Sequence, residues 1–379
     1  MSSTVSPFSA PLYVMLKPAG SMCNLRCRYC YYLEKKALYP DVSDFMMSET
    51  LLERFIKQYL GAQTQSYVNF TWHGGEPLLR GMAFYQKALA LQKRYGTRFY
   101  IENCLQTNGV LLNDEWCRFF KDNNFLIGIS IDGTAHCHNR YRVMPNGNPT
   151  FDRVMRGIEC LKKHDVAYNA MATVNNYNAD YPVEFYRFFK SIDCRYIQFS
   201  PVVETVNGKP AAWNVSARQW GNFLIKIFDE WVKRDVGAWF VQIFDATLAG
   251  WVGEKPGICT LAPTCGHAGV MEFNGDVYSC DHFVYPSCKL GNIYSNTLVE
   301  MMYSEQQSKF GAVKYDSLPA SCKACKYLFA CNGECPKNRI TETGHKERLN
   351  WLCKGYYRYF DHVAPYMEQM KRDYLRNLK

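Results

Sequence analysis

The chain has 379 residues, is 47% hydrophobic and carries a formal net charge of +9. This length and apolar content are enough to bury a large core, so we expect a globular protein with one big domain and a smaller one. The start lacks an export signal, no stretch approaches membrane-spanning length and the basic residues are scattered, so we expect a cytoplasmic protein with no membrane or nucleic-acid partner.

From Pro11 to about Arg234, apolar β-rich runs alternate with amphipathic segments, as expected of βα units. The predicted strands are Leu12 to Lys17, Tyr67 to His73, Phe99 to Gln106, Phe125 to Asp132, Val166 to Val174 and Cys194 to Val202. The predicted helices are Ser48 to Leu60, Met82 to Tyr95, Asp114 to Asn123, Phe151 to His164, Tyr181 to Ser191 and Ala217 to Lys233. Repeated βα units favour a parallel, curved or barrel-like sheet, with function at the C-terminal ends of its strands.

Four motifs stand at those strand ends. A three-cysteine loop, Cys23 to Cys30, follows the first strand, and His73 to Pro77 (HGGEP) ends the second. Gln106 to Gly109 ends the third strand and Ser130 to Gly133 ends the fourth. We expect the four segments to meet at one rim of the sheet.

The cysteine loop has the spacing Cys23-x3-Cys27-x2-Cys30 and so offers three thiolates. An iron-sulfur cubane is normally held by four cysteines, so three would leave one iron open to a small molecule. A zinc site is the alternative, but zinc takes a fourth ligand and no histidine lies between Cys30 and His73. In the HGGEP segment, glycines let the backbone approach a ligand closely, although a plain strand-to-loop turn has the same composition.

Beyond about Val241 the alternation fades, and we expect a loop-rich segment that metal ligation helps to fold, followed by a helix over Tyr356 to Lys379. Eight cysteines there suffice for two fully ligated clusters, and structural zinc fits their CxxC pair equally well. None of the eight histidines has a convincing ligand partner in the sequence. We expect the remaining six thiols to pack in the core: Cys104, Cys117, Cys137, Cys160, Cys194 and Cys288.

The CxxxCxxC loop and the GGEP segment, Gly74 to Pro77, resemble the radical S-adenosylmethionine (radical SAM) superfamily, and the later cysteines resemble its SPASM extension. Within that group the LQTNG and ISIDG segments and the Tyr278 to Asp281 stretch are similar to the anaerobic sulfatase-maturating enzymes. The resemblance implies an α/β fold, with a partial (β/α)6 barrel over 1–240 and a cysteine-rich SPASM-type domain over 241–379.

The resemblance also implies ligands. Gly75 and Tyr29 would touch S-adenosylmethionine beside Gly74 and Glu76, Ser130 and Arg142 would hold its ribose or carboxylate, and Ile197 would line the adenine pocket. Otherwise Ser130 and Arg142 would be solvated or in turns, and Ile197 would be core. Three [4Fe-4S] clusters are implied, on Cys23, Cys27 and Cys30; on Cys259, Cys265, Cys280 and Cys335; and on Cys322, Cys325, Cys331 and Cys353.

In the sulfatase-maturating group the position of Asp281 is the proton acceptor, whereas an exposed aspartate is the ordinary expectation. The implied reaction is oxidation of a Cys or Ser in an unfolded or nascent sulfatase segment of Cys/Ser-x-Pro-x-Arg type to Cα-formylglycine, with flavodoxin or ferredoxin as reductant. For His73 and His282 we expect structural or solvent roles. The alternatives are a SPASM-type maturase that forms a thioether or other crosslink, and a non-enzymatic iron-sulfur or zinc protein.

Overall fold

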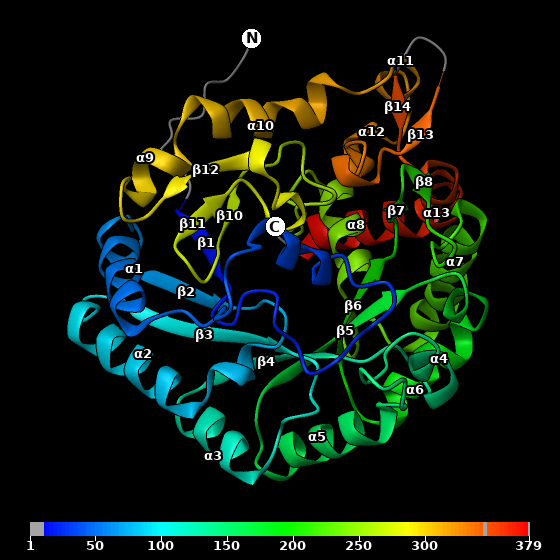
Figure 1. Ribbon diagram of the computed structural model, residues 1–379. Helices are drawn as coiled ribbons and strands as arrows, with labels where there is room; N and C mark the ends of the chain where they lie inside the picture. The colour runs from blue at the N-terminus through cyan, green and yellow to red at the C-terminus, as the bar shows by residue number, and fades with distance from the viewer. Residues whose placement is uncertain (1–10, 344–346, 378–379) are drawn as a thin grey trace. The chain divides into compact units, whose positions relative to one another are not determined.

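The computed structural model describes residues 11–343 and 347–377, which form two compact units (Figure 1). The first unit combines residues 11–129 with Val143–Tyr168 and Gly266–Gly311. The second combines Ser130–Arg142, Asn169–Cys265 and the described residues from 312 to 377. Each unit is therefore assembled from stretches that are far apart in the sequence, and a domain boundary near residue 240 stays a prediction.

The first unit is built on a mixed sheet whose strands run in the order β12-β11-β10-β1-β2-β3-β4. The pairs from β10 through β4 are parallel, whereas β11 pairs antiparallel with both β10 and β12. Figure 1 shows the yellow β10 beside the blue β1, joining late and early parts of the chain. The strands are β1 (Tyr13–Leu16), β2 (Tyr67–Trp72), β3 (Tyr100–Thr107), β4 (Phe125–Ser130), β10 (Ala268–Met271), β11 (Asp276–Tyr278) and β12 (Lys289–Asn292).

Helices pack against this sheet through apolar faces. On α1, Phe55 and Tyr59 place their rings against Phe70 of β2, with centroids 6.3 and 5.1 Å away. The Ser48 side chain accepts a hydrogen bond from the Leu51 amide and so fixes the start of α1. The α-helices are α1 (Glu49–Gly61), α2 (Met82–Tyr95), α3 (Asp114–Asp122), α5 (Phe151–Lys163) and α9 (Leu298–Met302), and the 3-10 turns are η2 (Leu33–Leu38), η3 (Pro77–Arg80), η5 (Asp281–Phe283) and η6 (Pro286–Cys288).

The second unit contains the parallel strands β5 (Tyr168–Val174), β6 (Tyr196–Pro201) and β9 (Phe240–Val241). Its longest helices, α7 (Ala217–Arg234) and α13 (Cys353–Asn377), cross where Gly221 faces Gly355; a Cβ added to Gly221 would lie 2.8 Å from the Gly355 carbonyl oxygen. The other helices are α4 (Ala135–Asn139), α6 (Pro182–Ser191), α8 (Gln242–Val252), α11 (Ala320–Lys323), α12 (Leu328–Cys331), η4 (Asn178–Asp180) and η7 (Pro336–Asn338), and α10 (Glu305–Asp316) spans the boundary. Two small hairpins pair β7 (Thr205–Val206) with β8 (Lys209–Pro210) and β13 (Thr341–Glu342) with β14 (Arg348–Leu349).

All six predicted strands and all six predicted helices of the βα region are present, most with bounds within one or two residues. The expectation of a loop-rich segment beyond Val241 is wrong in part, because α8, α10 and the strands β10 to β12 lie there. The C-terminal helix begins at Cys353, earlier than predicted, and its last two predicted residues lie outside the described ones. Among the described residues, no helix has both the length and the apolar character needed to cross a membrane.

Candidate functional site

The segment after β2 is joined to the chain leading into the cysteine loop. The Gly75 amide donates to the Gly20 carbonyl at 2.9 Å, and the Glu76 amide donates to the Met22 carbonyl at 2.8 Å. A Cβ at Gly75 would collide with the Met22 carbonyl, and Gly74 has φ +135°, a conformation that L side chains rarely adopt. The two glycines therefore allow the segment after β2 to lie against the segment that leads into the cysteine loop. This contact fixes the position of the loop relative to β2.

Glu76 extends the same connection to the end of β3. Its carboxylate accepts hydrogen bonds from the Thr107 hydroxyl at 2.9 Å, the Asn108 amide at 2.8 Å and the Leu78 amide at 3.1 Å. The side chain is fully buried, and burial raises its pKa to about 7 although these donors favour the ionised form. Glu76 thus fastens the loops after β2 and β3 together; a direct contact with a cofactor stays a prediction.

The three thiols of the loop after β1 gather beside this connection. Burial first, and then the neighbouring Glu76, Cys27 and Cys30, raise the pKa of the Cys23 thiol to about 12. The Cys23 sulfur accepts from the Leu25 amide at 3.3 Å, and the Asn108 side-chain amide lies 3.7 Å from it. The motifs after β1, β2 and β3 meet as predicted, whereas Ser130 to Gly133 belongs to the second unit.

Asp281 lies beside the end of β1. Because β10 pairs in register with β1, with Met271 opposite Leu16, the turn after β11 is brought to the residue that follows β1. There the Asp281 carboxylate forms an ion pair with Lys17 and accepts a hydrogen bond from the Tyr31 hydroxyl. The Asp281 side chain is 17% exposed and Lys17 is fully buried, so the expectation of an ordinary exposed aspartate is wrong.

The charges around Asp281 keep it ionised. Burial would raise the pKa of this carboxyl, but the ammonium of Lys17 outweighs that effect and lowers the pKa below its usual range. Burial and then the charge of Lys17 lower the pKa of His73 to about 3, so its imidazole is neutral near pH 7 and its Nδ1 can accept from Lys17 Nζ at 3.1 Å. The site therefore contains an ionised acceptor, a buried cation and a neutral imidazole.

Tyr32 and Glu272 also lie around Lys17, and the sequence analysis did not predict this role for either residue. The Lys17 ammonium lies 4.4 Å from the centroid of the Tyr32 ring, and the Tyr32 hydroxyl donates to Glu272 at 2.5 Å. Burial raises the pKa of Glu272 to about 7. A lysine that ends an otherwise apolar strand is the signal that could have indicated a buried cation here. His282 packs edge-on against Tyr31, with ring centroids 4.9 Å apart.

In the second unit, Arg142 is neither solvated nor in a simple turn. Its Nε lies 2.9 Å from the carboxylate of Asp132, which is fully buried, and its terminal nitrogen donates to the Thr173 hydroxyl at 3.1 Å. The Thr173 amide in turn donates to Asp132 at 2.8 Å. The pair therefore holds the guanidinium in one orientation, and Asp132 is a positioning residue that sequence reasoning missed.

The other residues predicted to contact the cofactor are Ile197, Ser130 and Tyr29. Ile197 is 1% exposed on β6, opposite Ala170 of β5, and is thus a core position as its ordinary interpretation has it. Ser130 is half-buried at the end of β4, and Tyr29 is buried within the cysteine loop. Their contacts with a cofactor stay predictions.

Of the later cysteines, Cys322, Cys325, Cys331 and Cys353 are electrostatic neighbours. A hydrogen bond to the Cys322 thiolate, followed by burial and by the charges of Cys322, Cys331 and Cys325, raises the pKa of the Cys353 thiol above its usual range. The bond that Cys353 donates lowers the pKa of Cys322 to about 7. These four thiols are the set that the resemblance assigns to one cluster.

Cys259, Cys265 and Cys335 surround a buried lysine. The Lys314 ammonium donates to the carbonyls of Cys259 at 2.7 Å and Thr260 at 2.8 Å. Burial lowers the pKa of Lys314, and the nearby thiols and Glu334 oppose the shift. Arg339, also buried, donates to the Lys314 carbonyl at 2.7 Å. Two buried cations thus compensate negative charge where thiolate clusters are expected. Cys280 lies in the first unit, so its ligation with these three stays a prediction.

Of the six thiols expected in the core, Cys117, Cys137 and Cys194 are buried, but Cys104, Cys160 and Cys288 are only half-buried. The expectation is therefore wrong for half of them. Cys160 in particular lies on the surface of α5, next to Asp114 and His164.

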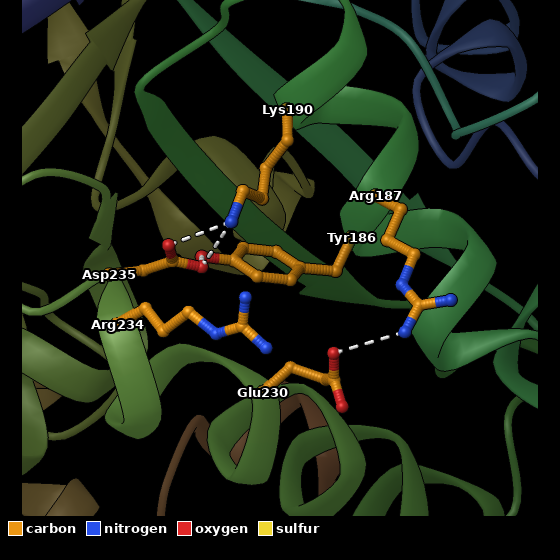
Figure 2. A pocket seen from close by; sticks show the side chains of 6 residues that line it. All are labelled: Tyr186, Arg187, Lys190, Glu230, Arg234 and Asp235. Carbon is orange, nitrogen blue, oxygen red and sulfur yellow. Dashed lines mark hydrogen bonds and ion pairs between the residues drawn. The ribbon is translucent and has the colours of Figure 1, made fainter.

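A polar cavity of about 220 Å³ in the second unit lies apart from the predicted residues. Figure 2 shows the Tyr186 hydroxyl and the Lys190 ammonium both directed at the carboxylate of Asp235, at 2.8 and 2.7 Å. Arg187 pairs with Glu230 at 3.3 Å on the other wall. Because both of its carboxylates are paired with cations and none of the residues that line it carries a thiol, this cavity does not compete with the site around Asp281.

Comparison with known proteins gives matches along nearly the whole chain. The model of the radical SAM superfamily matches residues 18–189, and that of an iron-sulfur cluster-binding domain, SPASM, matches residues 265–326. A serine-type anaerobic sulfatase-maturating enzyme of Bacteroides thetaiotaomicron is 59% identical, covering 98% of this chain and 94% of the relative. A cysteine-type enzyme of Clostridium perfringens is 31% identical, covering 94% and 97%.

A solved structure, native anSMEcpe with bound AdoMet and Cp18Cys peptide, superposes with a TM-score of 0.87. It is 30% identical and covers 96% of this chain and 99% of its own. The α/β fold with a cysteine-rich C-terminal part is therefore confirmed.

Proposed function

Since this chain belongs to the anaerobic sulfatase-maturating enzymes of the radical SAM superfamily, we propose that it oxidises a Cys or Ser side chain of a sulfatase to Cα-formylglycine. The observation that supports this most directly is the ionised, half-buried carboxylate of Asp281, held by Lys17 and Tyr31 in the unit that also carries the three-thiol loop. The enzyme is thus an oxidoreductase that modifies a protein after translation.

The chain offers suitable sites for its cofactors. Cys23, Cys27 and Cys30 would hold a cluster with one open iron, and the two later groups of four would hold two more [4Fe-4S] clusters. When bound, the open cluster and S-adenosylmethionine supply the 5′-deoxyadenosyl radical that removes a hydrogen atom from Cβ of the substrate.

Residues around the cofactor would bind and orient it. Gly75, close to the cysteine loop, would offer backbone without steric hindrance, beside Gly74, and Tyr29 would pack against the ligand. The paired guanidinium of Arg142 would bind the ribose or carboxylate together with Ser130, and Ile197 would line the adenine pocket. Glu76 would act chiefly by joining the loops that carry these contacts.

Asp281 would accept the proton of the substrate's thiol or hydroxyl as Cβ is oxidised. Lys17 and the Tyr31 hydroxyl keep the carboxylate ionised and oriented, while His73 stays neutral and does not compete with Lys17 for the carboxylate. Besides the hydrogen atom and this proton, the oxidation releases one electron, which a cluster on the later cysteines would accept. From serine these losses give the aldehyde directly; from cysteine they give the thioaldehyde, which is hydrolysed to the same product.

The substrate is an unfolded or nascent sulfatase segment of Cys/Ser-x-Pro-x-Arg type, and the electrons come from a reductant such as flavodoxin or ferredoxin. Several relatives are named serine-type, including the one that is 59% identical, so we expect a serine peptide to be accepted. We also propose that the radical SAM part spans 1–240 and the SPASM part 241–379.

The test is anoxic incubation of the reconstituted enzyme with reductant, S-adenosylmethionine and matched Ser-x-Pro-x-Arg and Cys-x-Pro-x-Arg peptides. Formylglycine formation removes about 2 Da from serine and about 18 Da from cysteine, and an aldehyde-reactive hydrazide must label both products. A thioether or other crosslink also removes about 2 Da but leaves nothing for the hydrazide to label. A product without aldehyde therefore supports a crosslinking maturase, and absence of 5′-deoxyadenosine supports a non-enzymatic iron-sulfur or zinc protein.

A further inference from the structure

Three side chains that could bind a metal ion meet on the surface of the first unit, on helix α3, on helix α5 and at the C-cap of α5. The Nε2 atom of His164 lies 2.5 Å from Oδ1 of Asp114, and Sγ of Cys160 lies 3.9 Å from the same oxygen. One ligand atom from each residue lies within 4.8 Å of the other two. None of the three belongs to the cysteine groups assigned to clusters.

Local sequence explains why they meet. Asp114 is the first residue of α3, after the N-cap Asn113, where a carboxylate interacts favourably with the helix dipole. Cys160 and His164 are four residues apart, and the His164 amide donates to the Cys160 carbonyl, so both side chains lie on the same face of α5. The end of α5 thus presents a thiol and an imidazole to the start of α3.

A surface ion-pair network is the ordinary interpretation of part of this cluster. Lys163 Nζ lies 2.8 Å from Asp114 Oδ1, and the bonds from Lys163 and then His164 lower the pKa of Asp114 to about 2. This network does not explain the thiol, because a neutral sulfur 3.9 Å from the carboxylate adds little to an ion pair. The Lys163 side chain is 66% exposed and can swing away.

We propose that Asp114, Cys160 and His164 bind one divalent cation, with zinc as the best match, and so link α3 to α5. A thiolate, an imidazole and a carboxylate are the ligand types that zinc takes, at about 2.0 to 2.3 Å. Tetrahedral binding needs ligand atoms about 3.3 to 3.8 Å apart, so the histidine must move outward and the cysteine inward by small amounts. His164 and Asp114 are 17% and 49% exposed, so both can adjust and water can take the fourth position.

Behind the three ligands lies a second thiol. Burial and then a hydrogen bond with Cys160 raise the pKa of Cys117, which is fully buried on α3. Cys117 therefore supports the Cys160 side chain from the interior and stays protonated. Because Cys117 is buried, we do not count it among the ligands, which are the three surface residues.

The test measures protection of one thiol in the intact, reconstituted holoenzyme. Under anoxic conditions the enzyme is treated with iodoacetamide, with and without one equivalent of Zn²⁺, and labelling of Cys160 is followed by mass spectrometry of its peptide. We expect zinc to slow labelling of Cys160 by about tenfold or more. Cys104, another half-buried thiol outside the cluster sets, is the internal control and must label at the same rate in both samples.

The variant His164→Ala removes one ligand and should abolish the protection, with iron content unchanged. Equal protection in this variant, or no protection in the wild type, overturns the proposal. A second measurement on the wild type covers the case in which the variant fails to fold. Zinc-edge X-ray absorption should show one sulfur at about 2.3 Å and nitrogen or oxygen at about 2.0 to 2.1 Å. A first shell of four sulfurs, or of none, places zinc elsewhere and refutes the site.

Discussion

Lys17 and Asp281 are far apart in the sequence and form an ion pair, because β1 and β10 are neighbouring parallel strands. The pair connects the strand that leads into the three-thiol loop with the turn that follows Cys280. Asp281, the proposed proton acceptor, is thereby fixed relative to that loop by backbone pairing.

Asp281→Asn should leave cleavage of S-adenosylmethionine in place but lower formylglycine formation by about 100-fold or more, because an amide does not accept the substrate proton. Both products are measured by chromatography and mass spectrometry from the same incubation. Asp276→Asn is the matched control: Asp276 is also buried and pairs with Lys289 at 2.6 Å, but lies outside the site. Full aldehyde yield from the Asp281 variant would remove its assigned role.

Cys27→Ala should abolish 5′-deoxyadenosine production, because two thiolates do not hold a cluster in the required state, and should lower iron by roughly four atoms per chain. Iron analysis and chromatography check the two effects. Cys104→Ala, a change at a half-buried thiol outside the cluster sets, should keep both values at the wild-type level. Cofactor cleavage by the Cys27 variant would reject the three-thiol site.

Gly75→Ala should reduce the iron content of the first site and weaken S-adenosylmethionine binding, because the new Cβ would collide with the Met22 carbonyl and displace the cysteine loop. Iron analysis and calorimetric titration of the cofactor measure these changes. The control is Gly61→Ala in α1, where an added Cβ meets nothing within 4 Å. That change should stabilise the helix slightly, by up to about 1 kcal/mol. If both variants bind cofactor equally well, the close approach has no functional role.

Asp132→Asn should lower the free energy of unfolding by about 3 kcal/mol and weaken cofactor binding, because the buried guanidinium of Arg142 would lose its counter-charge. Chemical unfolding and cofactor titration measure the two effects. Glu230→Gln breaks the surface pair with Arg187 seen in Figure 2 and should cost no more than about 1 kcal/mol. Unchanged cofactor affinity in a folded Asp132 variant would show that the orientation of Arg142 is unimportant.

His138 should make the protein sensitive to acid. Burial lowers the pKa of its imidazole to about 3, and its Nδ1 accepts from the Asp132 amide at 3.3 Å. Near pH 7 the His138 imidazole is neutral in both the folded and the unfolded protein. Below about pH 6.5 it binds a proton in the unfolded protein first. Relative to His138→Gln, the wild type should therefore lose about 1.4 kcal/mol per pH unit as the pH falls from 6.5 toward 3. Pulse proteolysis at pH 7.0, 6.0 and 5.0 measures the difference, and a pH-independent difference contradicts it.

The βα region could be predicted because its signals are local. Residues such as Phe55 and Tyr59 repeat at helical spacing, and the strand ends carry recognisable motifs. The strands β10, β11 and β12 have only three or four residues each, too few to show a period, so they were missed. The helix α8 was missed because apolar residues occur around most of it, which hides the helical pattern.

In the candidate site, too, the residues with local sequence signals could be predicted and those that depend on long-range contacts could not. The three thiols and Asp281 lie in short motifs that can be recognised in the sequence. The role of Lys17 becomes clear only from its ion pair with Asp281, which lies in the turn after β11. Likewise His164 gains Asp114 and Cys160 as neighbours only when α3 and α5 pack together. A single sequence contains the residue types but not the pairings that long-range strand and helix contacts create.

The position of β10 also has a consequence for the order of synthesis. Leu16 of β1 pairs with Trp72 on one side and Met271 on the other, so a nascent chain that stops short of residue 268 leaves β1 as an open edge, prone to wrong pairing. The stretch that closes this edge is followed within ten residues by Asp281. The late stretch of chain that closes the edge of β1 therefore also brings Asp281 to Lys17, so the sheet edge and this ion pair are completed one shortly after the other during synthesis.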